Sequence, residues 1–256
     1  MGVLFNADLG STWYTLPFNR QCVLVVLTAL SLVPTACGLT LMTWNVSGNG
    51  ASDWSTNAVQ VQAIGRQVAA LNPDIITFNE IPRSKTYEMT NFVNDWLPGY
   101  YLATNSGTDN FIRSVIASRY PITRWQSWLS RSDLSAFGYN GVFTRDLFEA
   151  EIQLAGTAEP LHIFTTHLKC CEDSDSLQRR AAEASATSNF IVNVFLPTSP
   201  HRQYVLTGDL NEDILRPLSG SFHPIQRITN GTGLTLTTPT NSFPGADRTI
   251  SIRRGV

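Results

Sequence analysis

The amino-acid sequence predicts a layered domain of mixed helices and strands, of the α/β or α+β class. Short apolar runs, typical of buried strands, alternate along the chain with longer stretches whose apolar residues recur at helical spacing. Polar side chains follow directly after several of the short runs, and no repeat, low-complexity tract or linker divides the chain. Helices packed on sheets bury both kinds of pattern, so one layered domain is expected.

The first half of the domain is predicted to hold four strands and two helices. The expected strands cover residues 39–44, 75–78, 100–103 and 115–117. A helix over 57–71 places Val61 and Ile64 on one apolar face and ends at Pro73. A second helix over 89–97 ends at a Pro-Gly pair.

The second half is predicted to hold a hairpin, a long helix and a further strand. The hairpin joins strands over 148–154 and 161–166. A third helix shows apolar residues at helical spacing over 177–195 and is expected to end at Pro197. The last strand, over 204–207, has the short apolar run of a buried strand.

The composition argues against tight electrostatic binding of long nucleic acids. Hydrophobic residues make up 43% of the 256 residues, and charged residues make up only 15%. The net charge is −2, from 18 basic and 20 acidic side chains. Proteins that clamp a nucleic-acid backbone usually carry a basic excess. A small phosphodiester, or brief contacts with a polymer, remains compatible with this charge.

The N-terminal segment is expected to direct export. Residues 22–33 form an apolar run that is shorter than the span a membrane helix needs, and small residues follow it. This pattern is typical of a signal peptide, so we expect a lead over 1–37 and a domain over 38–256, secreted or periplasmic. The alternative is that the run forms a buried strand or helix. Cys37, between Ala36 and Gly38, also resembles a lipid-attachment site.

The chain has four cysteines, and none has the spacing of a zinc site. Cys22 lies within the expected signal. Cys170 and Cys171 are adjacent, so they cannot cross-link distant segments. They are either two reduced thiols or, in an oxidising compartment, a strained disulfide between neighbours.

Five polar residues stand at or just beyond the C-terminal ends of predicted strands, where a layered sheet offers side chains to a shared cleft. They are Asn45, Glu80, His167, Asp209 and Asn211. Each alone could simply begin a loop, but together they suit one task. Carboxylates are the oxygen ligands that Mg²⁺ and Mn²⁺ prefer, and amides and a histidine can orient water or contact a phosphoryl oxygen. The histidines lack the paired spacing of a zinc site, and no G-x-S-x-G elbow of a serine hydrolase is present.

The order of these motifs resembles the endonuclease/exonuclease/phosphatase superfamily, which includes pancreatic-type deoxyribonucleases, abasic-site endonucleases, inositol-phosphate phosphatases and bacterial sphingomyelinases. The similarity covers about residues 39–215. The motifs are TWNVSGNG (43–50), DIITFNEI (74–81), SRYPI (118–122), RDLFEAEI (145–152), TTHLK (165–169) and LTGDLNED (206–213). The resemblance implies a four-layer α/β/β/α sandwich with two central, mostly antiparallel sheets.

The resemblance also implies roles for the strand-end residues. Glu80 would be the main ligand of Mg²⁺ or Mn²⁺, with Asn45 beside it. His167 would contact the scissile phosphate, Asp209 would orient the attacking water, and Asn211 would support the phosphate or the metal.

Three further residues are expected near the cleft. Arg145 would contact a substrate phosphate, the alternative being a salt bridge with Asp146 or Glu149. Tyr139 and Asn140 are expected to line the cleft, although both residue types are also common in turns.

The sequence departs from the family pattern near its end. The family carries a Ser-Asp-His element on its last strand, and no such element occurs here. His223, within SFHPIQ, does not match it, and Arg248 is followed by Thr-Ile-Ser where an Asp is expected. We therefore expect a domain that lacks its last strands, because the chain is truncated, is read in a shifted frame or comes from a degenerate gene.

The expected function is metal-dependent hydrolysis of phosphoesters, most plausibly by a monomeric phosphodiesterase or nuclease without an obligate protein partner. The substrate is a nucleic acid, a lipid headgroup or a small phosphoester. Its identity is expected to depend on irregular loops over 104–113 and 126–141. One alternative is a catalytically dead member that retains only metal or phosphate binding. The other is an exported scaffold with accidental motifs.

Overall fold

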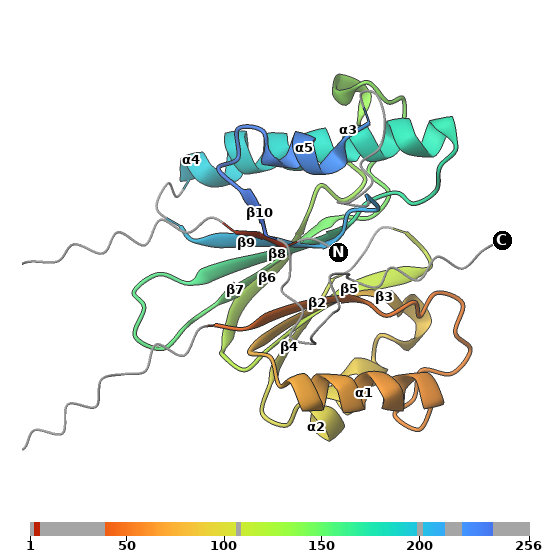
Figure 1. Ribbon diagram of the computed structural model, residues 1–256, viewed down its shortest axis with the longest axis vertical. Helices are drawn as coiled ribbons and strands as arrows, with labels where there is room; N and C mark the ends of the chain where they lie inside the picture. Colours follow the sequence, from red (N-terminus) through yellow and green to blue (C-terminus); the bar gives the residue numbers. More distant parts are fainter. Residues whose placement is uncertain (1–2, 6–38, 106–108, 199–201, 213–221, 238–256) are drawn as a thin grey trace, which may run out of the picture.

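Two β-sheets pack face to face, and helices cover the outer face of each (Figure 1). The computed structural model describes residues 3–5, 39–105, 109–198, 202–212 and 222–237. The layers follow the order helix, sheet, sheet, helix. The predicted four-layer α/β sandwich is therefore confirmed.

The smaller sheet has four strands in the order β2-β3-β5-β4. Its strands are β2 (Leu41–Asn45), β3 (Ile75–Pro82), β4 (Tyr101–Thr104) and β5 (Ile112–Ser118). β2 and β3 are parallel, and the other pairs are antiparallel. Its covering helices are α1 (Val59–Leu71) and α2 (Glu88–Trp96). A short 3-10 turn, Arg83–Lys85, follows β3.

The larger sheet has six strands in the order β10-β1-β9-β8-β7-β6. Its strands are β1 (Val3–Phe5), β6 (Ile122–Trp128), β7 (Leu147–Ile152), β8 (Leu161–His167), β9 (Tyr204–Asp209) and β10 (Thr235–Thr237). β8 and β9 are parallel. Its helical layer comprises α3 (Ser174–Phe190), a π-helical turn (Ile191–Phe195), α4 (Leu196–Thr198) and α5 (Pro224–Thr229). A 3-10 turn, Ser135–Phe137, precedes β7.

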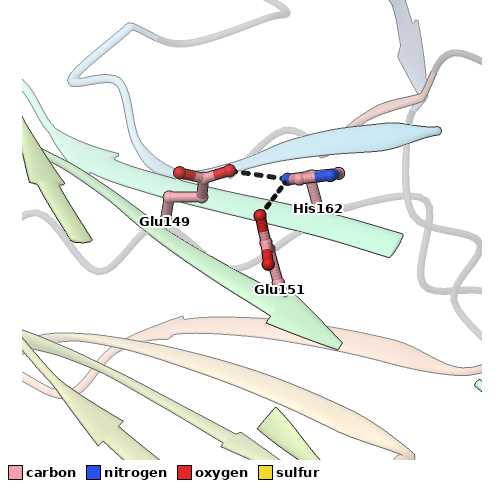
Figure 2. A group of neighbouring side chains, drawn as sticks. All are labelled: Glu149, Glu151 and His162. Carbon is pink, nitrogen blue, oxygen red and sulfur yellow. Dashed lines mark hydrogen bonds and ion pairs between the residues drawn. The ribbon is translucent and has the colours of Figure 1, made fainter. Parts of the chain in front are cut away.

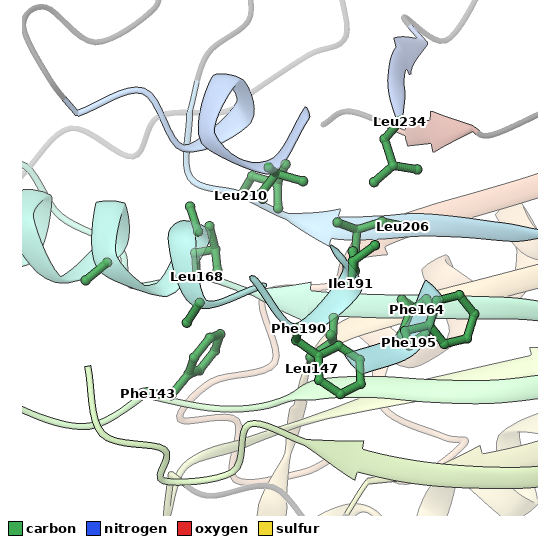
Figure 3. Close-up of a cluster of buried hydrophobic side chains, with 14 of the residues drawn as sticks. Phe143, Leu147, Phe164, Leu168, Phe190, Ile191, Phe195, Leu206, Leu210 and Leu234 are labelled. Atoms are coloured by element: carbon green, nitrogen blue, oxygen red, sulfur yellow. The ribbon is translucent and has the colours of Figure 1, made fainter. Parts of the chain in front are cut away.

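Three hydrophobic clusters hold the four layers together. One lies between the larger sheet and its helices and includes Phe164, Phe190 and Leu206 (Figure 3). A second lies between the smaller sheet and its helices, and a third fills the space between the sheets. Phe148 and Ile163 belong to the third cluster. Neighbouring residues of one strand therefore enter different cores, as the alternation of strand side chains requires.

The sequence explains where the helices begin and end. Asp173 caps α3 by accepting a hydrogen bond from the Ser176 N–H. Asn72 ends α1 in the left-handed conformation, with φ of 46°. The predicted stop at Pro197 is approximate, because α4 continues through this residue after the π-helical turn.

Every predicted strand and helix is present, but several boundaries were wrong. β3 continues to Pro82, four residues beyond the predicted end, and β5 begins at Ile112 within a segment that we expected to be loop. β6 was missed, and it extends to Trp128, inside the second expected loop. β6 lies at the edge of its sheet and is largely exposed, so it lacks a continuous apolar run.

Part of the N-terminal lead joins the larger sheet as β1, which pairs with β9 and β10. The apolar run over 22–33 lies outside the described residues, as does Arg248. The signal peptide and the truncation therefore stay predictions. The helices that the structure describes include none with the length and apolar character needed to cross a membrane.

A buried hydrogen bond between two threonines joins the two sheets. The hydroxyls of Thr77 on β3 and Thr207 on β9 are 2.9 Å apart, and both residues are buried. Thr207 also donates to the Phe164 carbonyl, 2.9 Å away. Thr207 therefore donates within its own sheet and accepts from the hydroxyl of Thr77 across the interface.

This arrangement predicts unequal effects of two isosteric substitutions. Thr207→Val removes the acceptor of the buried Thr77 hydroxyl and should lower the free energy of unfolding by roughly 1–3 kcal/mol. Thr77→Val leaves Thr207 bonded to Phe164 and should cost only about 0.5–1.5 kcal/mol. Urea unfolding of both variants and of the double variant tests the asymmetry. Equal losses for the two single variants would contradict it.

Candidate active site

Three of the predicted site residues point into the space between the sheets because of strand alternation. Asn45 ends β2, His167 ends β8 and Asp209 ends β9. Side chains an even number of residues apart on a strand point to the same face. Asp209 is two residues from Thr207 and His167 is four residues from Ile163, and both of these face the opposite sheet. β8 and β9 are in register, so His167 lies directly beside Asp209.

Glu80 reaches the same place through a break in this alternation. Phe78 packs against the helices of the smaller sheet, so a regular strand would point Glu80 outward as well. The pairing of β3 with β5 shifts register between Phe78 and Ile81, and Glu80 has a φ of +63°. A β-bulge of this kind re-aims a side chain. It turns Glu80 towards Asn45.

The amide of Asn45 joins two carboxylates from different sheets. Its Nδ2 donates to Glu80 Oε1 at 2.9 Å and to Asp209 Oδ2 at 2.8 Å. Its oxygen accepts the backbone N–H of Ser47 at 2.9 Å, which fixes the orientation of the amide. In this geometry Asn45 therefore bridges the two carboxylates.

His167 faces both carboxylates with a neutral ring. Its Nε2 lies 3.9 Å from Glu80 Oε1 and 3.9 Å from Asp209 Oδ2, too far for direct hydrogen bonds. Burial, followed by the positive charge of Arg145, lowers the pKa of His167 from 6.5 to about 3. The ring is therefore uncharged at neutral pH and cannot offset the charge of the carboxylates.

Asp209 is held in its ionised form. Burial acts to raise the pKa of its carboxyl. Hydrogen bonds from the amide of Asn45 and from the backbone N–H of Asn211 counteract burial, and the pKa of Asp209 lies below its usual value. The Asn211 N–H donates to Asp209 Oδ1 at 2.9 Å. The Asn211 side chain donates to the Leu168 carbonyl at 2.9 Å, so it ties the loops after β8 and β9 together.

Gly208 is needed for the close approach of these two strands. It pairs with Thr166 across the β8–β9 ladder and has a φ of +127°. A Cβ at this position would lie 1.9 Å from the Thr166 carbonyl oxygen. Any other residue would therefore push apart the strand ends that carry His167 and Asp209.

A narrow pocket connects Glu80 and His167 with a group of basic and polar side chains. It is lined by Glu80, Asn105, Ile112, Arg113, Ser114, Arg145 and His167. Arg145 donates to the carbonyls of His167 and Leu168 at 2.8 and 3.0 Å. It forms a salt bridge with Asp109 at 3.0 Å, and not with either of the partners considered from the sequence. Arg145 thus holds a guanidinium in the wall of this pocket.

The sequence reading missed Asp109 because it lies in a segment that we expected to be irregular. Asp109 accepts hydrogen bonds from the N–H groups of Phe111 and Ile112 as well as from Arg145. It therefore fixes both the loop and the arginine. An acidic residue three positions before the buried run 112–118 was the available signal.

Tyr139 and Asn140 do not line this pocket. They line a separate open groove near the start of α3, together with Gln178, and the Tyr139 hydroxyl donates to Asp175 at 3.1 Å. The expectation that they line the cleft was wrong. The cause is the 3-10 turn before β7, which directs this loop towards α3.

The carboxylate pair fits a divalent cation. Glu80 and Asp209 present hard oxygen donors within reach of one amide, and the His167 ring that faces both of them adds no positive charge. Carboxylate donors favour Mg²⁺ or Mn²⁺ over softer metals. A cation between them would relieve the repulsion of two like charges.

A second acidic group contains residue types that could also hold a metal ion. Glu149, Glu151 and His162 present ligand atoms within 4.8 Å of one another (Figure 2). They lie on the outer face of the larger sheet, where His162 packs edge-on against Phe195. Arg124 already donates to both carboxylates, at 3.1 and 2.7 Å. Both carboxylates of this group are therefore already engaged with a guanidinium.

His223 does not join the described site. It precedes α5, and its Nδ1 lies 3.5 Å from Glu212. Glu212 in turn accepts the Ile225 N–H at 2.8 Å. This pair therefore anchors the first turn of α5.

The lowered pKa of His167 predicts an acid-dependent loss of stability. The unfolded chain binds a proton at this residue near pH 6.5, but the folded chain does so only near pH 3. Between these values acidification favours the unfolded state. With chelator present, lowering the pH from 7.5 to 5 should cost wild type about 1–2 kcal/mol more than His167→Asn. Urea unfolding at both pH values measures the difference, and equal losses would refute the assignment of a buried neutral ring.

Comparison with known proteins agrees with this geometry. The endonuclease/exonuclease/phosphatase family profile matches residues 42–252. No curated protein sequence matches the chain significantly.

Similar folds occur among solved structures. A β-hairpin deletion mutant of beta toxin from Staphylococcus aureus is 19% identical, with a TM-score of 0.55 over 76% of this chain and 72% of that chain. Sphingomyelinase C from Streptomyces griseocarneus is 15% identical, with a TM-score of 0.51 over 76% and 69%. Truncated TDP2 from Caenorhabditis elegans is 18% identical, with a TM-score of 0.50 over 71% and 67%.

At these identities the structural likeness concerns the fold alone. The family profile, in contrast, covers most of the chain, including the strand ends that carry Asn45, Glu80, His167 and Asp209. The chain therefore belongs to the endonuclease/exonuclease/phosphatase family.

Proposed function

We propose that this protein hydrolyses phosphodiester bonds with the help of Mg²⁺ or Mn²⁺. One observation carries the proposal: Asn45 holds the carboxylates of Glu80 and Asp209 together beside the neutral ring of His167. Two carboxylates held by one amide, with Glu80 lining a pocket, are suited to bind a divalent cation. Arg145 and Arg113 line the same pocket and can attract an anionic substrate.

Each residue has a separate task in this proposal. Glu80 is the main metal ligand. Asp209, which is ionised because its pKa is lowered, accepts a hydrogen bond from the attacking water and orients it. His167, with its proton on Nε2, donates to a phosphoryl oxygen without adding charge. Asn211 holds the loop after β9 against Leu168, which keeps Asp209 in place.

A bound divalent cation supplies charge stabilisation for the phosphoryl oxygens as negative charge grows on them. Arg145 would also stabilise the negative charge on these oxygens. Its guanidinium is fixed by Asp109 and by the carbonyls of His167 and Leu168, so it needs little reorganisation when a phosphate binds.

The candidate substrates are nucleic acids, lipid headgroups and small phosphodiesters. The low content of basic residues favours a small or briefly held substrate over a tightly clamped polymer. The similar folds include a sphingomyelinase, so a lipid phosphodiester belongs among the tests. We also propose export of the protein, on the basis of the apolar run over 22–33.

Metal-dependent turnover that requires Glu80 is the central prediction. The purified chain should hydrolyse bis-p-nitrophenyl phosphate with Mg²⁺ or Mn²⁺ and lose this activity with chelator. Glu80→Gln removes the charge of the main ligand and should lower kcat/KM by about 10²-fold or more. Plasmid DNA and sphingomyelin, assayed in parallel, identify the preferred substrate.

Glu159→Gln is the matched control, because Glu159 is exposed in the turn between β7 and β8. It should keep full activity. If folded wild-type protein binds Mn²⁺ but turns over none of the three substrates, the alternative of a binding protein without catalysis replaces our proposal. Activity that survives both chelation and Glu80→Gln would reject the site itself.

A further inference from the structure

The loop after β8 carries two adjacent thiols close to the proposed site. Cys170 and Cys171 follow His167 by three and four residues. Both cysteines are free, and their Sγ atoms are 2.9 Å apart. Cys171 is exposed and Cys170 is partly exposed, so a small reagent in solution can reach the pair.

The backbone at this pair is held in an unfavourable conformation. Cys171 has a φ of +83°, a region that residues with a Cβ rarely occupy. Neighbouring hydrogen bonds hold it there: Arg180 donates to the Cys171 carbonyl at 2.8 Å, and the Lys169 N–H donates to Glu183 at 2.7 Å. A change at the two sulfurs therefore acts on a strained segment that these hydrogen bonds hold in place.

Arg180 links the thiol pair to the loop after β9. Its side chain is almost completely buried, and its guanidinium donates from one nitrogen to the Cys171 carbonyl and from another to the Asn211 carbonyl, 2.6 Å away. Two more hydrogen bonds connect the same loops, from Asn211 to the Leu168 carbonyl and from the Leu168 N–H to the Asp209 carbonyl. The conformation at Cys171 is thus coupled to the position of Asn211.

We propose that Cys170 and Cys171 are an oxidisable thiol pair that closes to a disulfide between adjacent residues, and that closure displaces the Cys171 carbonyl from Arg180 and loosens the loop of Asn211. The oxidant is a low-molecular-weight disulfide. One cysteine thiolate attacks it, forms a mixed disulfide and releases one small thiol. The second cysteine then attacks the mixed disulfide, forms the internal sulfur–sulfur bond and releases the second small thiol.

The expected disulfide is reversible because it is strained. Adjacent Cα atoms are about 3.8 Å apart across a trans peptide, whereas ordinary disulfides join Cα atoms about 4.4–6.8 Å apart. Strained and exposed disulfides are reduced readily and act as labile switches. The pair therefore suits a reversible modification better than a permanent cross-link.

Peptide mapping tests the modification without reference to activity. The folded full-length chain is incubated with oxidised glutathione, blocked with iodoacetamide and digested with trypsin. The peptide 170–179 contains both cysteines of the pair and no other. It should escape alkylation, be lighter than the reduced peptide by two hydrogen atoms, and become doubly alkylated after treatment with dithiothreitol. Two alkylated thiols, or a persistent glutathione adduct, would overturn the proposal.

Hydrogen–deuterium exchange tests the coupling to Asn211, again without reference to activity. Oxidation of wild type should speed exchange severalfold in the segment 205–212. The Cys170→Ser/Cys171→Ser variant, treated in the same way, should show no change. An oxidised peptide 170–179 with unaltered exchange in this segment would overturn the coupling.

The effect on hydrolysis rests on the proposed function. If the reduced protein is active, oxidation should lower its rate, dithiothreitol should restore it, and the double serine variant should be insensitive. An oxidised protein that keeps its full rate would also refute the coupling. If reduced wild type and the serine variant are both inactive, the proposed function fails, and the mass and exchange measurements still decide the thiol proposal.

Discussion

The site depends on holding two like charges together across the boundary between two sheets. Glu80 belongs to the smaller sheet and Asp209 to the larger one, and the single amide of Asn45 donates to both. An amide carries no charge, so it can orient the carboxylates but cannot neutralise them. The two carboxylates are consequently suited to bind a cation.

Backbone strain is concentrated where this arrangement is made. Several residues other than glycine have positive φ at or just after the strand ends that form the cleft. They are Ser47, Glu80, Cys171 and Asn211. Such conformations persist only where surrounding contacts enforce them, and they commonly mark functional sites. At Glu80 the consequence is direct, because the bulge moves a side chain from the helix-facing side of β3 to the cleft.

Regular strand geometry determines which site residues the sequence could reveal. Strand alternation and the position of polar residues after apolar runs were enough to find Asn45, His167 and Asp209, because regular geometry places them. Glu80 was found although its predicted strand end was wrong, since β3 continues through a bulge that leaves no periodic signal. Asp109 was not found, because its role depends on a long-range contact with Arg145. Edge strand β6 was missed because it is largely exposed and therefore has no continuous apolar run.

The two acidic groups of this fold show why ligand type alone does not identify a metal site. Glu149, Glu151 and His162 match the donor types of the cleft and lie within 4.8 Å of one another, yet a guanidinium already compensates part of their charge. Arg124 bonds both carboxylates, and the Trp128 indole N–H donates to Glu149 at 2.6 Å. Burial acts to raise the pKa of Glu149, but its bonds to His162, Trp128 and Arg124 lower it.

Replacing Arg124 by a cation at that outer group would break these contacts and return a guanidinium to solvent. At the cleft, a cation would not displace His167 as a charged partner of Glu80 or Asp209, because this ring is neutral. The difference follows from the face of the sheet on which each group lies. On the outer face, the buried Glu149 already has Arg124 as an ionic partner within the protein. The cleft opens to solvent, where the compensating charge can come from a bound ion.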